Sequence, residues 1–219
     1  IYGANKKLLQ PAHLYWSSLD EQSKSFQLFS DKIKGLQNYV IERSSKSVHE
    51  LFDVSQCVYL TPDSTEKLDQ LESDTVYIIG GLIDDNVKKN ATLEYAQKYK
   101  IKTARLPIME HCEKMEQGSF EQNLMISQVF DILMKFKECN DWKVALAMGL
   151  SSKVGLKPVT EVKQKHDGSQ NKVGISKKER KLLEKERLTK SLTCGLKVVV
   201  DCQFEDNMNE NELAQLSSQ

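Results

Sequence analysis

Apolar residues recur along this chain in two different spacings, and the alternation of the two predicts a fold class. Short runs rich in β-branched and aromatic residues, typical of strands, occupy residues 13–17, 57–61, 76–79, 102–106 and 196–201, with a weaker run at 39–41. Helical spacing occupies residues 23–35, 47–52, 65–71, 92–99, 121–138, 141–149, 176–191 and 209–219. Because strands that alternate with helices form parallel sheets covered on both faces, we expect an α/β fold.

Residues 151–175 interrupt this alternation. They are rich in Lys, Ser, Gly, Gln and Asn and have almost no large apolar side chain after Leu156. This composition predicts a flexible linker between a main part, residues 1–150, and a C-terminal part. The C-terminal part begins with a basic helix at 176–191, with only a thin apolar stripe, and continues into a strand and a helix at 192–219.

The run from Val76 to Asp84 combines a predicted buried strand with a double glycine and a carboxylate. Val76 to Ile79 has the composition of a strand covered on both faces, and Gly80 and Gly81 allow close approach to bare backbone. Two interpretations fit: a ligand-binding turn on which Asp84 acts, or a tight turn after a core strand. The spacing matches neither a dinucleotide-binding fingerprint nor a P-loop.

Two further predicted strands run into polar turns, in the segments Cys57-Val-Tyr-Leu-Thr-Pro-Asp-Ser64 and Lys102-Thr-Ala-Arg-Leu-Pro-Ile108. The carboxyl ends of neighbouring parallel strands line one crevice, which is where ligands bind in such sheets. The three turns therefore predict one pocket, although each is also an ordinary turn signal.

Charge is unevenly distributed although the net charge is zero. Residues 153–190 contain 12 lysines and arginines against five acidic residues, a net charge of +7, and the rest of the chain carries −7. A basic arm is typical of a polyanion contact, and a solvated charged helix has the same composition.

Several classes of protein do not fit the composition. No apolar run approaches the roughly 18 residues of a membrane span, and the first residues do not have the pattern of a signal peptide. The five cysteines are widely spaced and include no CxxC pair, so we expect reduced thiols in an intracellular protein. The four histidines lack metal-ligand spacing, so we expect no metal.

Five blocks, VYLTPDS, VYIIGGLIDDN, TLEYAQKYKIKTARLPI, SQVFDIL and DWKVAL, occur in this order along the chain. Together they closely resemble the tRNA position-9 purine N1-methyltransferases, a branch of the SPOUT superfamily. The resemblance implies a parallel sheet flanked by helices, with a C-terminal trefoil knot in the family's order. It also implies S-adenosylmethionine as cofactor and tRNA as substrate. The implied product at position 9 is 1-methylguanosine, with 1-methyladenosine as a second candidate product.

The order of the segments departs from that family. The block from Leu196 to Glu210, preceded by a basic helix, resembles the first strand and helix of the family's domain, yet here it comes last. We therefore expect residues 192–219 to belong to the same SPOUT domain as residues 1–150. The chain resembles either a circular permutant or a sequence whose segments are written out of order.

The resemblance also implies roles for individual residues. Asp84 matches the carboxylate proposed in the family as general base or base-orienting group, and Asp201 is a second acidic candidate, with a capping or core-edge carboxylate as the alternative. The implied cofactor contacts are Leu60, Thr61, Gly81, Asp85, Asn86, Val87, Lys88, Lys89, Leu93, Leu106, Pro107, Ile108, Met125, Ile126 and Ser127. The expected phosphate contacts are Lys6, Lys7, Arg105, Lys177, Lys178, Arg180 and Lys181.

We expect an enzyme that acts as a monomer in the nucleus or cytoplasm rather than the mitochondrion. The alternative is a non-catalytic RNA-binding protein that retains the SPOUT fold. Intact Gly80-Gly81, Asp84 and TARLPI favour the enzyme, since a decayed site should lose them first.

Overall fold

A computed structural model describes residues 1–81, 90–114, 124–150, 156–158 and 177–202. The strands are β1 (His13–Ser17), β2 (Glu42–Arg43), β3 (Cys57–Leu60), β4 (Val76–Gly80), β5 (Lys102–Ala104), β6 (Cys112–Lys114), β7 (Leu156–Pro158) and β8 (Lys197–Asp201). The α-helices are α1 (Tyr2–Asn5), α2 (Lys24–Lys32), α3 (Val48–Leu51), α4 (Ala91–Lys98), α5 (Ile108–His111), α6 (Ile126–Cys139), α7 (Trp142–Gly149) and α8 (Lys177–Cys194). Short 3-10 turns occupy Leu36–Asn38 and Val54–Gln56.

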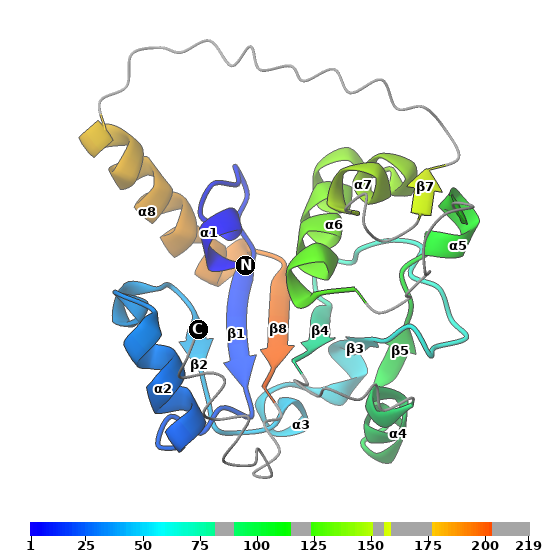
Figure 1. Cartoon of the computed structure of the whole chain (residues 1–219), viewed down its shortest axis with the longest axis horizontal. Coiled ribbons are helices and arrows are strands. Elements are labelled where there is room, and N and C mark those ends of the chain that lie inside the picture. Colours follow the sequence, from blue (N-terminus) through cyan, green and yellow to red (C-terminus); the bar gives the residue numbers. More distant parts are fainter. Residues whose placement is uncertain (82–89, 115–123, 151–155, 159–176, 203–219) are drawn as a thin grey trace.

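Six strands form one parallel sheet in the order β2-β1-β8-β4-β3-β5 (Figure 1). The last strand in sequence, β8, lies in the middle of the sheet and pairs with β1 on one side and β4 on the other. Val199 is thus opposite both Tyr15 and Ile78. The α/β class and the parallel sheet are confirmed, and β8 joins the C-terminal part of the chain to the same sheet as residues 1–150.

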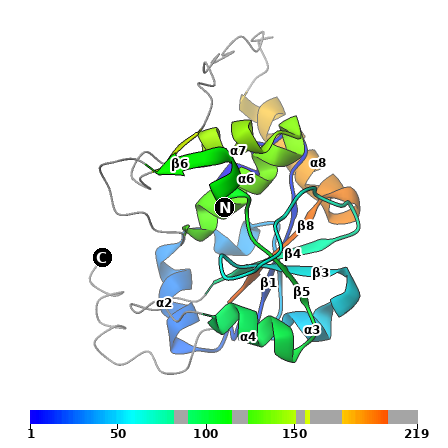
Figure 2. The ribbon, with the colours of Figure 1, turned by 90° about the vertical axis from the view of Figure 1, so that its right-hand side faces the viewer.

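Side chains alternate between the two faces of the sheet, as the pleat requires. On one face Tyr59, Ile78 and Val199 pack with Val48 of α3 and Ala96 of α4. The other face, which includes Leu14, Tyr77 and Val198, packs against α6 and α7. Figure 2 shows α6 and α7 on one side of the sheet and α3 and α4 on the other. Both faces are buried, which explains why the strands consist of continuous apolar runs.

Helix ends follow local capping chemistry. Ser47 and Glu50 form a capping box at the start of α3. The Asp141 carboxylate accepts from the backbone N–H groups of Lys143 and Val144 and starts α7. Asn140 has φ 50°, a left-handed conformation that ends α6 and lets α7 begin two residues later.

The helix predicted at 65–71 is wrong. The segment instead forms an isolated parallel bridge between Lys67 and Arg105, in which the Arg105 N–H donates to the Glu66 carbonyl at 2.8 Å and the Leu68 N–H donates to the Arg105 carbonyl at 2.9 Å. The Trp142 indole N–H also donates to the Asp69 carbonyl at 2.9 Å. Long-range hydrogen bonds therefore override a local helical pattern.

Smaller differences concern short elements. The weak strand expected at 39–41 lies three residues later, as β2. The pattern did not predict α1, α5, β6 or β7. The strand β7 lies within the predicted linker. Its Leu156 is buried and pairs with Lys114 of β6 in an antiparallel ribbon. The helix expected at 209–219 lies outside the described residues. Among the described residues, no helix has the length and apolar character needed to cross a membrane.

Candidate functional site

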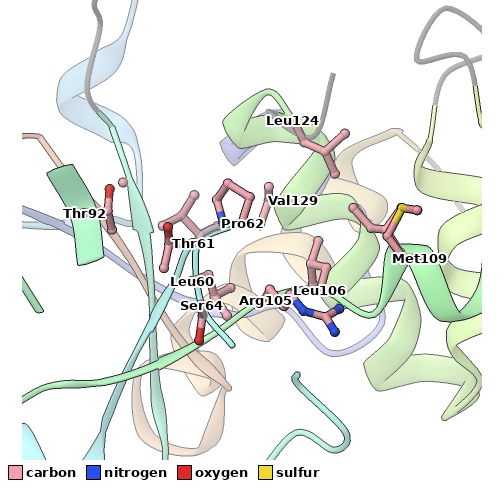
Figure 3. A pocket seen from close by; sticks show the side chains of 13 residues that line it. Leu60, Thr61, Pro62, Ser64, Thr92, Arg105, Leu106, Met109, Leu124 and Val129 are labelled. Carbon is pink, nitrogen blue, oxygen red and sulfur yellow. The ribbon is translucent and has the colours of Figure 1, made fainter. Parts of the chain in front are cut away.

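A cavity of about 430 Å³ lies where β3, β4 and β5 end, beside the start of α6. Figure 3 shows side chains from the turns after β3 and β5, from α5 and from α6 around this space. Its lining consists of Leu60, Thr61, Pro62, Ser64, Ile79, Gly80, Thr92, Arg105, Leu106, Ile108, Met109, Leu124 and Val129. The turns after β3 and β5 therefore line one cavity, together with Gly80 at the end of β4, whereas residues 82–89 of the third predicted turn lie outside the described residues.

The cavity suits a small organic ligand of mixed polarity. Its volume lies within the roughly 300–1,000 Å³ of ordinary ligand sites, and its walls are mainly aliphatic. The hydroxyls of Thr61, Ser64 and Thr92 supply a few polar groups among these walls. Among the described residues, no group of three or more His, Cys, Asp or Glu side chains is arranged to hold a metal ion.

The double glycine contributes to the site in two different ways. Gly80 lines the cavity, and a β-carbon added there would meet the hydroxyl oxygens of Thr92 and Tyr59 at 3.6 Å each. Gly81 is packed against β8, where its N–H donates to the Asp201 carbonyl at 2.9 Å. A β-carbon at Gly81 would lie 2.9 Å from that carbonyl oxygen, so close approach to β8 requires glycine.

Arg105 joins two parts of the cavity wall. Its backbone is hydrogen-bonded to residues 66 and 68, and its guanidinium forms a bidentate ion pair with Glu110 of α5, at 2.6 and 3.0 Å. This pairing raises the pKa of Arg105 and lowers that of Glu110. The turn formed by Leu106, Pro107 and Ile108 is thus held at both ends. Arg105 was expected to contact phosphate, yet in this structure a carboxylate already balances its charge.

Asp201 ends β8 and is completely buried, with 0% exposure. The hydroxyls of Ser17 and Ser18 donate to its Oδ1 at 2.9 and 2.7 Å, and the Tyr59 hydroxyl donates to its Oδ2 at 3.0 Å. Burial, and next the Asp201 charge, raise the pKa of Tyr59 well above its usual range, so this hydroxyl remains a donor. Such donors offset the cost of removing a carboxylate from water.

The predicted cofactor residues divide into three groups. Leu60, Thr61, Leu106 and Ile108 line the cavity. Gly81, Leu93, Pro107, Met125, Ile126 and Ser127 are described but do not line it. Asp85, Asn86, Val87, Lys88 and Lys89 lie outside the described residues, and so does Asp84, the predicted catalytic carboxylate.

The predicted phosphate ligands lie on the surface, apart from Lys6 and Arg105, which are partly buried. Lys177, Lys178, Arg180 and Lys181 are all exposed on the first turns of α8. The other end of α8 contacts β1. At Gly195, directly after α8, an added β-carbon would lie 2.9 Å from the backbone nitrogen of His13. Lys7 is exposed in the segment between α1 and β1.

Several lining residues were not among the predicted cofactor contacts. Pro62 and Ser64 belong to the block VYLTPDS, and their position directly after β3 is one at which ligand-binding residues occur in parallel sheets. Leu124 lies two residues before α6 and Val129 in its first turn, and the apolar spacing of α6 is the same as that of a core helix. The spacing of apolar residues alone does not distinguish a side chain in a cavity wall from one in the core.

Comparison with known proteins identifies a family that this chain matches. A model of the family described as tRNA (guanine(9)-N(1))-methyltransferase TRM10/TRM10A matches residues 1–155. The rat protein named tRNA methyltransferase 10 homolog B is 40% identical over 154 residues, covering 69% of this chain and 48% of that protein. The human protein of the same name is 36% identical over 160 residues, covering 71% and 50%. The chain spans about half the length of the curated relatives it matches.

Solved structures agree with these relatives. The full-length spTrm10–SAH complex has a TM-score of 0.58 and 32% identity, covering 68% of this chain and 79% of that one. The structure of spTrm10(74) has a TM-score of 0.58 and 30% identity over the same shares. The likeness confirms the SPOUT class, whereas the trefoil knot stays a prediction. By its sequence and its fold, the chain belongs to the tRNA (guanine(9)-N(1))-methyltransferase TRM10/TRM10A family.

Proposed function

We propose that this protein binds S-adenosylmethionine in the cavity and methylates N1 of guanine at position 9 of tRNA. The observation that carries the proposal is the cavity at the ends of β3, β4 and β5, in a chain of this family. A relative of known structure is a complex with SAH. The mixed apolar and hydroxyl lining suits a ligand that has both a flat purine and polar groups.

The residues around the cavity would bind and orient the cofactor. Aliphatic walls from Leu60, Leu106 and Val129 would enclose the adenine and exclude water, and Gly80 would leave backbone accessible. The cofactor, when bound, supplies an electrophilic methyl group on a sulfonium. No metal is needed for such a transfer, because the protein has only to aim the purine nitrogen at that methyl.

The proton on N1 must leave as the N1–methyl bond forms, with S-adenosylhomocysteine as the second product. Asp84 is the proposed acceptor or orienting group for this proton. A carboxylate with an ordinary pKa of about 4 is a weak base, so Asp84 would orient the purine or accept the proton late in the reaction.

Exposed basic side chains of α8, together with Lys6 and Lys7, would bind tRNA phosphates. Their positions on the exposed first turns of one helix and in the segment after α1 support contact with the shape of the RNA rather than with its sequence. We further propose that the protein acts as a monomer in the nucleus or cytoplasm. All five cysteines are free, which fits a reducing compartment.

The test is incubation with unmodified tRNA and S-adenosylmethionine, followed by mapping of reverse-transcription stops. We expect a stop at position 9 that requires cofactor and is lost or strongly reduced in Asp84→Ala. A stop elsewhere would refute the proposed site of methylation. Binding of tRNA without any methyl transfer would support the non-catalytic alternative.

A further inference from the structure

Asp201 lies on the far side of the sheet from the aliphatic wall of the cavity. Asp201 is paired with Gly80 in the sheet, and it follows Val199 by two residues, so it projects toward the face covered by α3 and α4. Leu60 and Ile79 line the cavity and belong to the opposite face. With 0% exposure and no place in the cavity lining, the carboxylate is badly placed to touch a substrate.

Asp201 is nevertheless connected to the cavity through the double glycine. Its carbonyl accepts from the Gly81 N–H at 2.9 Å. Its carboxylate accepts from Tyr59, whose hydroxyl is one of the atoms nearest to Gly80. Asp201 therefore contacts Gly81 directly through its backbone carbonyl. It also fixes the Tyr59 ring, which packs against Gly80, through its carboxylate.

The remaining donors come from the end of β1. Ser18 has φ 53°, a left-handed conformation that is uncommon for a residue other than glycine. This conformation accompanies a hydrogen bond of 2.7 Å from the Ser18 hydroxyl to Asp201, beside the bond from Ser17. The Ser17 carbonyl also accepts from the Cys202 N–H at 3.0 Å. Three strands, β1, β3 and β8, therefore converge on one carboxylate.

We propose that Asp201, Ser17, Ser18 and Tyr59 form a positioning network that sets the Gly80-Gly81 turn for cofactor binding, and that Asp201 exchanges no proton with the substrate. The inference rests on the proposed function, because it assigns the turn to a cofactor site. It replaces the catalytic role considered for Asp201 with an indirect one. Displacing a binding wall by a fraction of an ångström is enough to weaken a preorganised site.

The first experiment measures S-adenosylhomocysteine binding by calorimetry, without RNA or turnover. Tyr59→Phe removes one hydroxyl from the network and keeps the ring. Its matched control is Tyr77→Phe, because Tyr77 is also buried and its hydroxyl accepts from the Glu72 N–H, away from the turn. We expect Tyr59→Phe to weaken binding about tenfold and Tyr77→Phe to change it less than about twofold. Ser17→Ala is a milder second variant should Tyr59→Phe fail to fold.

The second experiment separates positioning from proton transfer. Asp201→Asn keeps the size of the side chain and removes its charge. We expect weaker cofactor binding, but at saturating cofactor a single-turnover methylation rate within about threefold of wild type and an unchanged pH profile. Loss of a general base costs about 100-fold or more.

Each outcome has a distinct meaning. A wild-type chain that does not bind S-adenosylhomocysteine contradicts the proposed function itself. If wild type binds and Tyr59→Phe binds as Tyr77→Phe does, the positioning network is refuted and the hydroxyls serve only folding. Normal cofactor binding by Asp201→Asn together with a rate reduced about 100-fold would instead make Asp201 catalytic.

Discussion

Gly81 lies so close to β8 that a side chain has no room there. The nearest atoms to an added β-carbon are the Asp201 carbonyl oxygen at 2.9 Å and Val200 Cγ1 at 3.3 Å. The first is a backbone atom of a central strand and moves only if the strand moves. Steric exclusion at this one residue therefore fixes how the end of β4 packs against β8 beside the cavity.

We predict that Gly81→Ala lowers both stability and cofactor affinity. Overpacking of this kind costs about 1–3 kcal/mol, and the displaced turn should weaken S-adenosylhomocysteine binding at least about tenfold. Gly3→Ala is the matched control, because no atom of the described residues lies within 4 Å of a β-carbon there. Thermal unfolding and calorimetry measure the two effects. Equal behaviour of both variants would show that the close approach at Gly81 is relaxed in solution.

The buried thiols give a second prediction for individual residues. Burial raises the pKa of Cys57 and of Cys112 to about 11, and burial with the Asp201 charge raises that of Cys202 to about 12, from an ordinary 9.0. At about pH 8 these thiols are protonated and shielded, whereas Cys194 is exposed. Iodoacetamide at this pH should modify Cys194 in the native protein and leave the three buried cysteines intact, as read by peptide mass spectrometry. Rapid alkylation of Cys202 would contradict its burial in the cluster with Leu19, Phe26 and Leu36.

At the scale of elements, α8 has a different character from the helices that cover the sheet. Leu188 and Ser191 are its buried residues, and its first turns are exposed and basic. A helix of this kind contributes little to the core and has charge available for a partner. Arg105 differs from the basic residues of α8, because its bidentate ion pair with Glu110 connects the turn after β5 to α5.

We predict that Lys177→Ala/Lys178→Ala weakens tRNA binding and reduces its salt dependence. For each phosphate that the variant no longer neutralises, the slope of log affinity against log salt should fall by about 0.7–0.9. Affinity for S-adenosylhomocysteine should not change, since α8 does not line the cavity. Lys24→Ala/Lys32→Ala, which removes two exposed lysines from α2, is the control. An unchanged slope in the α8 variant would remove this end of α8 from the RNA-binding surface.

At the scale of the whole molecule, the sheet depends on its last strand. Without β8 the strand order would separate into β2-β1 and β4-β3-β5, because β8 is the strand that pairs with both β1 and β4. Asp201, which supports the turn at the cavity, is also part of β8. The C-terminal part of the chain therefore completes both the core and the site.

We predict that Val199→Pro prevents folding or lowers the free energy of unfolding by at least about 3 kcal/mol. Proline removes a ladder hydrogen bond and cannot be accommodated in a central strand. Lys177→Pro is the control, because proline is tolerated at the first position of a helix. Circular dichroism during thermal unfolding distinguishes the two. A Val199→Pro variant as stable as wild type would mean that β8 is not held between β1 and β4.

The strands were predictable because they are covered on both faces and therefore consist of continuous apolar runs, as in Val76 to Ile79. Their order was not, because the insertion of β8 between β1 and β4 is a long-range pairing that no local pattern encodes. Site residues at strand ends, such as Thr61 and Leu106, were predictable from topology. Val129 was not, because a cavity wall and a core contact use the same aliphatic side chains. The non-helical path of residues 65–71 depends on Arg105 and Trp142, far away in sequence.

The central claim is that the cavity at the ends of β3, β4 and β5 is the cofactor site. The most direct measurement is a crystal structure of this chain with S-adenosylhomocysteine. We predict ligand density within the cavity, in contact with Leu60, Gly80 and Leu106. Ligand bound elsewhere on the molecule, with this cavity empty, would contradict the account.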